Sequence, residues 1–244
     1  MSDHRPRIGV VTFPGSLDDR DALRAVGVMG GDPVSVWHTD RSLAGADAII
    51  LPGGFSYGDY LRTGAIARFA PVMESVGAFA AAGGPVLGIC NGFQILCEAG
   101  LLPGALVRNK GLAFVCRLVT IRVEPDSAGA GDSSGNLTIG RPGELLAVPI
   151  KHGEGRFVAS SDELERLESN GQVAVRYCSP AGDVSKDFNP NGSTNGIAGI
   201  WNEAGNVLGL MPHPEHAVDP DIGPTGGQPV LQWLVSAARA RVPA

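Results

Sequence analysis

The sequence predicts an α/β fold, namely a single domain with a mostly parallel open sheet, helices on both of its faces and a nucleophile elbow. The first reason is that short apolar runs alternate with helical patterns along the first half of the chain. The second is that no internal repeat or interdomain linker divides its 244 residues. The third is a G-x-C-x-G motif at residues 88–92, between a strand and a helix. We therefore expect one domain over residues 1–244, with its core at about 7–241.

Four strands and three helices are expected in the first half of the chain. A buried strand is predicted where a short apolar run ends at glycine or proline, as residues 47–51 do before Pro52 and Gly53. A helix is predicted where apolar residues recur three or four apart, as Leu23, Val26 and Met29 do. The expected strands are 7–13, 34–38, 47–51 and 86–89, and the expected helices are 17–30, 72–82 and 92–99.

The second half of the chain is richer in strands. Strands are expected at 115–123, 145–150, 172–178, 197–201 and 207–211, and helices at 161–169 and 228–241. Residues 125–140 are rich in Gly, Ser and Asp, which predicts a mobile surface loop.

Composition and motifs exclude several classes of function. The net charge of −6, without a basic run, disfavours a nucleic-acid partner. Glycine, proline or charge interrupts every long apolar stretch, so no membrane span is expected. There is no phosphate-binding G-x-x-x-x-G-K-[ST] loop, no G-x-G-x-x-G after the first strand and no cluster with metal-ligand spacing. We therefore expect this chain to hold no cofactor and no metal.

The start of the sequence and its cysteines favour a cytoplasmic location. No apolar signal core precedes the first expected strand. The four cysteines show neither a disulfide framework nor paired metal spacing, which is typical of a reducing compartment. Cys97 and Cys116 are interpreted as buried structural thiols.

Cys90, in the centre of the G-x-C-x-G motif, is the candidate nucleophile. Small flanking residues permit a strained turn that lifts a nucleophile above the sheet, and the following helix directs its free N–H groups at the sulfur. The backbone N–H of Asn91 is then a candidate oxyanion donor, and Gly54, after the strand at 47–51, is a second one. The alternative is a buried structural cysteine between two packing glycines.

Two histidines compete for the role of general base. His213 follows the expected strand at 207–211, and Pro214 favours an extended backbone that lets Glu215 reach the His213 ring. This arrangement would form a Cys–His–Glu relay. His152 and Glu154 have the same spacing, but the glycine between them fixes their geometry less well. Sequence alone favours His213 and leaves His152 open.

Several motifs together resemble one enzyme family. PGG at 52–54, GICNGFQ at 88–94 and PHPE at 212–215 resemble class I (triad) glutamine amidotransferases in that order. The longer motifs GGFSYGDYLRTGAIA at 53–67, HGEGRF at 152–157 and NPNGS at 189–193 resemble glutaminase subunits of phosphoribosylformylglycinamidine synthases, which act in purine biosynthesis. The resemblance extends over nearly the whole chain.

The resemblance implies roles for particular residues. Cys90 would be the nucleophile, His213 the base and Glu215 the residue that orients it, with Gly54 and Asn91 as oxyanion donors. The remaining residues would bind glutamine, and they are Gln94, His152, Glu154, Gly155 and Phe157.

The resemblance also implies partners. A synthase subunit would use the ammonia, with ATP and magnesium, to make the amidine, and a small subunit would bridge the two. Lys151 and His216 stand at positions where the family pattern leads us to expect other residues. Two alternatives are another cysteine α/β hydrolase or protein-repair enzyme, and a non-catalytic scaffold subunit.

Overall fold

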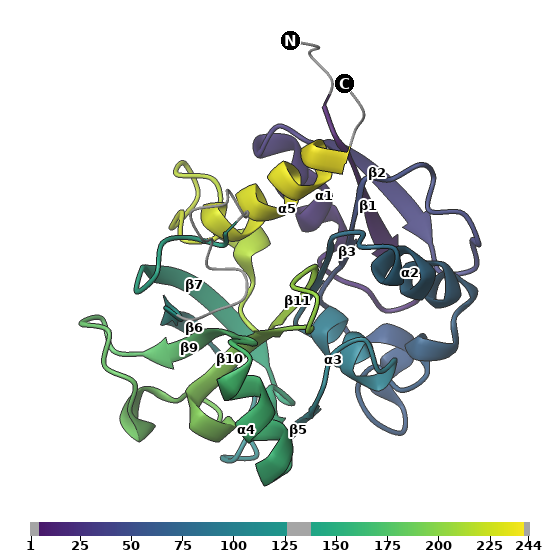
Figure 1. The fold of residues 1–244 in the computed structure, drawn as a ribbon. Helices are drawn as coiled ribbons and strands as arrows, with labels where there is room; N and C mark the ends of the chain where they lie inside the picture. The colour runs from purple at the N-terminus through teal and green to yellow at the C-terminus, as the bar shows by residue number, and fades with distance from the viewer. Residues whose placement is uncertain (1–4, 126–137, 242–244) are drawn as a thin grey trace.

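The computed structural model describes residues 5–125 and 138–241. Most of its strands belong to one large sheet (Figure 1). These strands are β1 (Arg7–Thr12), β2 (Asp32–Trp37), β3 (Ala48–Leu51), β4 (Val86–Ile89), β6 (Val115–Val123), β7 (Leu145–His152), β9 (Val173–Cys178), β10 (Ile197–Trp201) and β11 (Val207–Leu210). Their order across the sheet is β2-β1-β3-β4-β11-β10-β9-β6-β7.

One half of the sheet is parallel and the other half is antiparallel. Strands β2, β1, β3, β4 and β11 are neighbours in parallel register. The remaining pairs are antiparallel, so that β9 and β7 again follow the common direction and only β10 and β6 oppose it. Every residue of β3, β4 and β11 is buried, as apolar strands covered on both faces require.

Helices cover both faces of the parallel half (Figure 1). Helices α1 (Asp19–Val28) and α5 (Gln228–Arg241) pack against each other and against β1, while α3 (Asn91–Glu98) packs on β3, β4 and β11. The helix α2 (Pro71–Ala81) precedes β4, and α4 (Ser161–Ser169) lies near the antiparallel half, where its Glu168 contacts Arg176 of β9. Among the described helices, none has both the length and the apolar character that crossing a membrane requires.

The expected α/β fold is confirmed, with two differences worth noting and one expectation that lies partly outside the described residues. Strands β5 (Ala105–Val107) and β8 (Arg156–Val158) form a separate antiparallel pair that was not predicted, because three-residue strands carry too little pattern. Cys116 was expected to be buried, but it is exposed because it lies on the outer face of β6. Residues 126–137 of the predicted loop at 125–140 lie outside the described residues.

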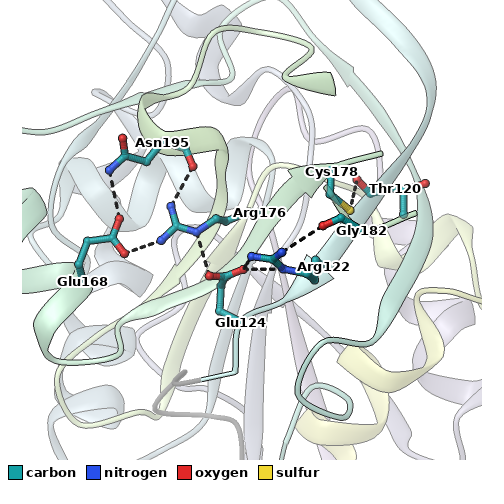
Figure 2. A network of polar contacts seen from close by, with 8 residues as sticks. All are labelled: Thr120, Arg122, Glu124, Glu168, Arg176, Cys178, Gly182 and Asn195. Atoms are coloured by element: carbon teal, nitrogen blue, oxygen red, sulfur yellow. Dashed lines mark hydrogen bonds and ion pairs between the residues drawn. The ribbon is translucent and has the colours of Figure 1, made fainter. Parts of the chain in front are cut away.

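A network of polar contacts around the buried Arg176 links the antiparallel strands to α4 (Figure 2). Arg176 on β9 donates to Glu124 at 2.9 Å, to the carbonyl of Asn195 at 2.8 Å and to Glu168 of α4. Glu124 also accepts from Arg122 at 2.9 Å. Since a buried guanidinium left without partners is strongly unfavourable, the network fixes α4 and the turn at Asn195 against the sheet.

Candidate active site

Cys90 lies in a strained turn between β4 and α3. Its backbone has φ 51° and ψ −102°, a conformation that side-chain-bearing residues rarely adopt, and its N–H donates to the carbonyl of Leu210 at 2.8 Å. Gly92 makes the turn possible, because a Cβ there would lie 1.9 Å from the carbonyl oxygen of Leu51. The helix therefore begins directly against β3, with Cys90 as its N-cap residue.

His213 and Glu215 lie at the end of β11, the strand next to β4. Nδ1 of His213 lies 2.6 Å from Oε1 of Glu215, and both side chains are almost completely buried. The backbone N–H of His213 donates to the carbonyl of Pro149 at 2.9 Å, which fixes the segment on β7. Residues separated by more than a hundred positions in the sequence thus meet at the carboxyl ends of adjacent strands, as expected for an open α/β sheet.

The surroundings of His213 favour its protonated form. Burial lowers the pKa of His213, but the negative charges of Glu215 and Cys90 outweigh burial and raise the pKa to about 10. Nε2 of His213 is buried and has no hydrogen-bond partner among the described residues. The imidazolium is therefore the form suited to pairing with a thiolate on Cys90.

His152, the competing histidine, is engaged by Asn109. Nδ1 of His152 lies 3.1 Å from Oδ1 of Asn109, and this oxygen also accepts from the N–H of Gly155 at 3.0 Å. Burial and the nearby charge of His213 lower the pKa of His152 to about 4. His152 is therefore neutral near pH 7, and its pairing partner is an amide where His213 has a carboxylate.

A cavity of about 390 Å³ opens above the sulfur of Cys90. This volume is in the range of small-ligand sites. The predicted residues in its lining are Gly54, Cys90, Gln94, His152, Glu154 and His213. The sequence analysis did not single out Leu17, Asp18, Phe55, Asp59, Thr63, Phe114, Lys151 and Gly153 as lining residues.

The polar wall of this cavity is a chain of amides. Nε2 of Gln94 donates to the carbonyl of Glu154 at 2.5 Å, and Oε1 of Gln94 accepts from Asn91 at 2.9 Å. The Asn91 amide group also donates to Asp59 at 3.2 Å, and its oxygen accepts from the N–H of Ser56 at 3.1 Å. The backbone N–H of Asn91 opens α3, so it has no acceptor within the helix.

Gly155 and Phe157 are placed differently from the other predicted binding residues. Phe157 is fully buried and its ring stacks on Phe93 with centroids 6.2 Å apart, so its side chain is outside the cavity lining. The carbonyl of Gly155 accepts from Asn191 at 2.7 Å, and the N–H of Phe157 donates to Ser193 at 3.0 Å. The NPNGS motif therefore supports the loop that carries His152 and Glu154.

A second carboxylate, Asp18, lies beside the His213 ring. Oδ1 of Asp18 lies 2.5 Å from Nζ of Lys151 and 3.3 Å from Nε2 of His216, while Oδ2 lies 3.6 Å from Nδ1 of His213. The sequence analysis did not identify Asp18 as a site residue. Asp18 is the N-cap residue of α1, but its side chain makes no capping hydrogen bond, so the carboxylate is available to the site.

Four potential metal ligands come within 4.8 Å of one another here, on Asp18, His213, Glu215 and His216. Hydrogen bonds account for the arrangement, since His213 pairs with Glu215 and His216 pairs with Asp18. The ammonium of Lys151 also lies on Asp18 and supplies the positive charge that a cation would bring. We interpret the group as a hydrogen-bonded network around the candidate base His213.

Comparisons with known proteins place the chain in a family. A model of the CobB/CobQ-like glutamine amidotransferase domain matches residues 5–228. A Frankia casuarinae protein, phosphoribosylformylglycinamidine synthase subunit PurQ, is 57% identical over 223 residues, covering 91% of this chain and 90% of the relative. The Rubrobacter xylanophilus protein of the same name is 54% identical, covering 96% of this chain and 99% of the relative. A chain in the structure of PurLQS from Thermotoga maritima superposes with a TM-score of 0.79 at 40% identity, covering 96% of this chain and 99% of that chain.

Proposed function

This chain belongs to the family of CobB/CobQ-like glutamine amidotransferase domains, and from that premise we propose that it is the glutaminase subunit of a phosphoribosylformylglycinamidine synthase. One observation carries the proposal. His213 and Glu215 form a buried pair at 2.6 Å, at the end of the strand adjacent to the one that presents Cys90. A nucleophile, a base and its orienting carboxylate thus meet at one cavity.

The reaction follows from these positions. The thiolate of Cys90 attacks the side-chain carbonyl carbon of glutamine, and the oxyanion that forms accepts hydrogen bonds from the N–H groups of Gly54 and Asn91. The His213 imidazolium gives its Nε2 proton to the departing amine, which leaves as ammonia and yields a thioester. Water then attacks the thioester while His213 takes up a proton, and glutamate and the thiolate are released.

In this proposal glutamine is held by the polar residues that line the cavity beside Cys90. The carboxamide chain through Gln94 and Asn91 fixes the loop that carries Glu154, whose carboxylate lines the cavity and pairs with Arg108 at 3.4 Å. Nε2 of His152 is buried without a partner and is free to accept a hydrogen bond. We assign His152 and Glu154 to the amino-acid end of glutamine, with Gly155 and Phe157 supporting them from behind.

The apolar rim of the cavity supports a docked partner. Leu17, Phe55 and Phe114 line the cavity and are exposed by 61%, 46% and 56%, and Leu61 and Leu112, outside the lining, are exposed by 90% and 80%. Exposed apolar groups of this size mark interaction surfaces. A synthase subunit that covers this rim, with a small bridging subunit, would receive ammonia before water protonates it. In this proposal the synthase uses ATP and magnesium, this chain holds no cofactor, and the complex works in the cytoplasm.

Labelling with a diazoketone analogue of glutamine tests the assignment of the nucleophile. Mass spectrometry is expected to find the label on Cys90, and to find Cys97, Cys116 and Cys178 unmodified. The exposed Cys116 is the matched control, because it is a more accessible thiol in the same chain without a glutamine site. Label on another cysteine, with Cys90 free, would refute the assignment.

Reconstitution tests the proposed partnership. Glutamate release by the purified chain is expected to be slow and to rise by about tenfold or more with synthase, small subunit and nucleotide, because closure by a partner completes such sites. Full activity of the isolated chain, without gain on reconstitution, would instead favour a free-standing hydrolase.

A further inference from the structure

Lys151 and His216, at whose positions the resemblance led us to expect other residues, meet on one side chain. Both donate to the same oxygen of Asp18, at 2.5 Å from Lys151 and at 3.3 Å from His216. Asp18 precedes α1, Lys151 is on β7 and His216 follows Glu215, so three separate segments converge here. A convergence of this kind, on a buried carboxylate beside the candidate base, calls for a functional reason.

Asp18 remains charged although it is buried. Its side chain is 4% exposed, and burial alone would raise its pKa. Hydrogen bonds from His216 and Lys151, with the charge of His213, outweigh burial and hold the pKa of Asp18 well below its ordinary value. Gly53 leaves the space for this contact, because a Cβ there would lie 2.4 Å from Oδ2 of Asp18 and 2.8 Å from Cε1 of His213.

We infer that Asp18 is a positioning residue that acts through His213, as a second carboxylate which stabilises the imidazolium of the Cys90–His213 pair. Lys151 and His216 set the strength of this effect, because they share the negative charge of Asp18. The inference deepens the proposed function and rests on it, since it assumes that Cys90 and His213 form the reactive pair. Asp18 does not touch the reacting atoms, and Glu215 remains the direct hydrogen-bond partner of His213.

The charges around His213 give the effect a definite sign. Titratable groups surround the His213 ring on several sides. Glu215 and His216 belong to the same segment as His213, and Asp18 lies just before α1. The other neighbours are Lys151 and His152 on β7 and Cys90 in the elbow. Neutralising Asp18 removes a negative charge 3.6 Å from Nδ1 and leaves the ammonium of Lys151 unbalanced. Both changes make the imidazolium less stable. Removing the charge of Lys151 does the opposite.

The direction in which the pKa of His213 changes can be tested by alkylating Cys90 with iodoacetamide. The reaction is followed from pH 5 to about pH 11 by peptide mass spectrometry. The rate constant changes where the imidazolium loses its proton, which gives the profile an upper inflection. In Asp18→Asn this inflection is expected to fall by about one pH unit, the lower end of the range for a neighbouring charge that is partly neutralised. In Lys151→Met it is expected to stay or to rise. Asp21→Asn, the same change three residues later in the first turn of α1, is the control and is expected to match the wild type.

Cys116 serves as the internal standard, because it is exposed and lies outside the cavity lining. Its alkylation profile is expected to be the same in every variant. The double variant Asp18→Asn with Lys151→Met removes both charges of the pair, so neither is left without its partner. It allows the test even if a single variant fails to fold. Its inflection is expected about one pH unit below that of Lys151→Met. An unchanged inflection in both comparisons would overturn the inference.

Iodoacetamide needs no glutamine site, so the two levels of the proposal can fail separately. Shifted inflections in a chain that releases no glutamate, alone or with synthase, would leave the role of Asp18 standing and remove the proposed function. Glutamate release with unchanged inflections would do the reverse.

Discussion

Nδ1 of His152 lies 3.1 Å from Oδ1 of Asn109, and this contact decides the protonation of the ring. The amide nitrogen of Asn109 donates to the carbonyls of Ala113 and His152, each at 2.9 Å, so Oδ1 is the acceptor end. His152 must therefore carry its proton on Nδ1, which leaves Nε2 as an acceptor. A neutral ring fixed in this way suits binding better than proton transfer.

Replacing His152 by Gln is accordingly expected to act on substrate binding. KM for glutamine should rise by about tenfold, because one hydrogen bond is lost, while kcat stays within a few-fold of the wild type. His213→Gln should lower kcat by about a thousandfold or more. Steady-state glutamate release by the reconstituted complex measures both. A large loss of kcat in His152→Gln, with little loss in His213→Gln, would make His152 the base.

The two glutamates of the site, Glu215 and Glu154, are likewise expected to affect different kinetic constants. Glu215→Gln keeps the size of the side chain but removes the charge that stabilises the imidazolium, so kcat should fall by two to four orders of magnitude, on the order seen for an orienting carboxylate. Glu154→Gln should chiefly raise KM. Unfolding curves of both variants provide the control, and equal effects on kcat would contradict the assigned roles.

The backbone conformation of Cys90 predicts that glycine is more stable than alanine at this position. At φ 51° a glycine is relaxed while any side chain is strained, so Cys90→Gly should be more stable than Cys90→Ala by about 1 kcal/mol or more. Urea unfolding of the two inactive variants measures the difference. Cys97→Gly against Cys97→Ala, inside α3, is the matched control and should show the opposite order, because glycine destabilises a helix interior.

Asp59 predicts a dependence of stability on pH. Burial raises the pKa of Asp59 to about 6, against hydrogen bonds from Asn91 and Gly64 that lower it. Because this pKa is raised on folding, the stability that Asp59 contributes is complete below about pH 4 and is lost as the pH rises through about 6. Asp59→Asn should therefore gain on the order of 1–2 kcal/mol over the wild type at pH 8, roughly half of this gain at pH 5 and little at about pH 3.5. Urea unfolding at pH 8 and at about pH 3.5, with Asp21→Asn as the control, measures this gain, and a gain of equal size at both pH values would contradict it.

Much of the fold followed from local pattern. The apolar runs of β4 and β11 each lead into a motif that is typical of an active site, GICNG at 88–92 and PHPE at 212–215. The strands and the candidate residues could therefore be predicted together. The elements at 115–123, 161–169, 197–201 and 228–241 have the bounds that periodicity predicted. Long amphipathic or fully apolar segments carry enough pattern to be recognised one by one.

The contacts of Asp18 and Asn109 could not be predicted in this way. The helix predicted at 17–30 would place Asp18 in its first turn, but α1 begins at Asp19. Asp18 is therefore the residue before the helix, and it lines the cavity. Asn109 lies in no regular element, and its distant partners are His152 at the end of β7 and Gly155 in the loop that follows. Such contacts depend on how segments far apart in the sequence are brought together, which no local period encodes. The exposure of Cys116 is a similar case, because it depends on which face of β6 is covered.

The positions of the two described chain ends have a practical consequence (Figure 1). The strand β1 starts at Arg7 at the amino edge of the parallel strands, and α5 ends at Arg241, whose guanidinium lies over the ring of Phe79 and 3.5 Å from the carbonyl of Ala82, just before β4. Cys90 lies at the other end of β4. A fluorophore or sensor surface attached through either end therefore sits on the side away from the apolar rim, and binding of a synthase to the immobilised chain can be measured with that rim unobstructed.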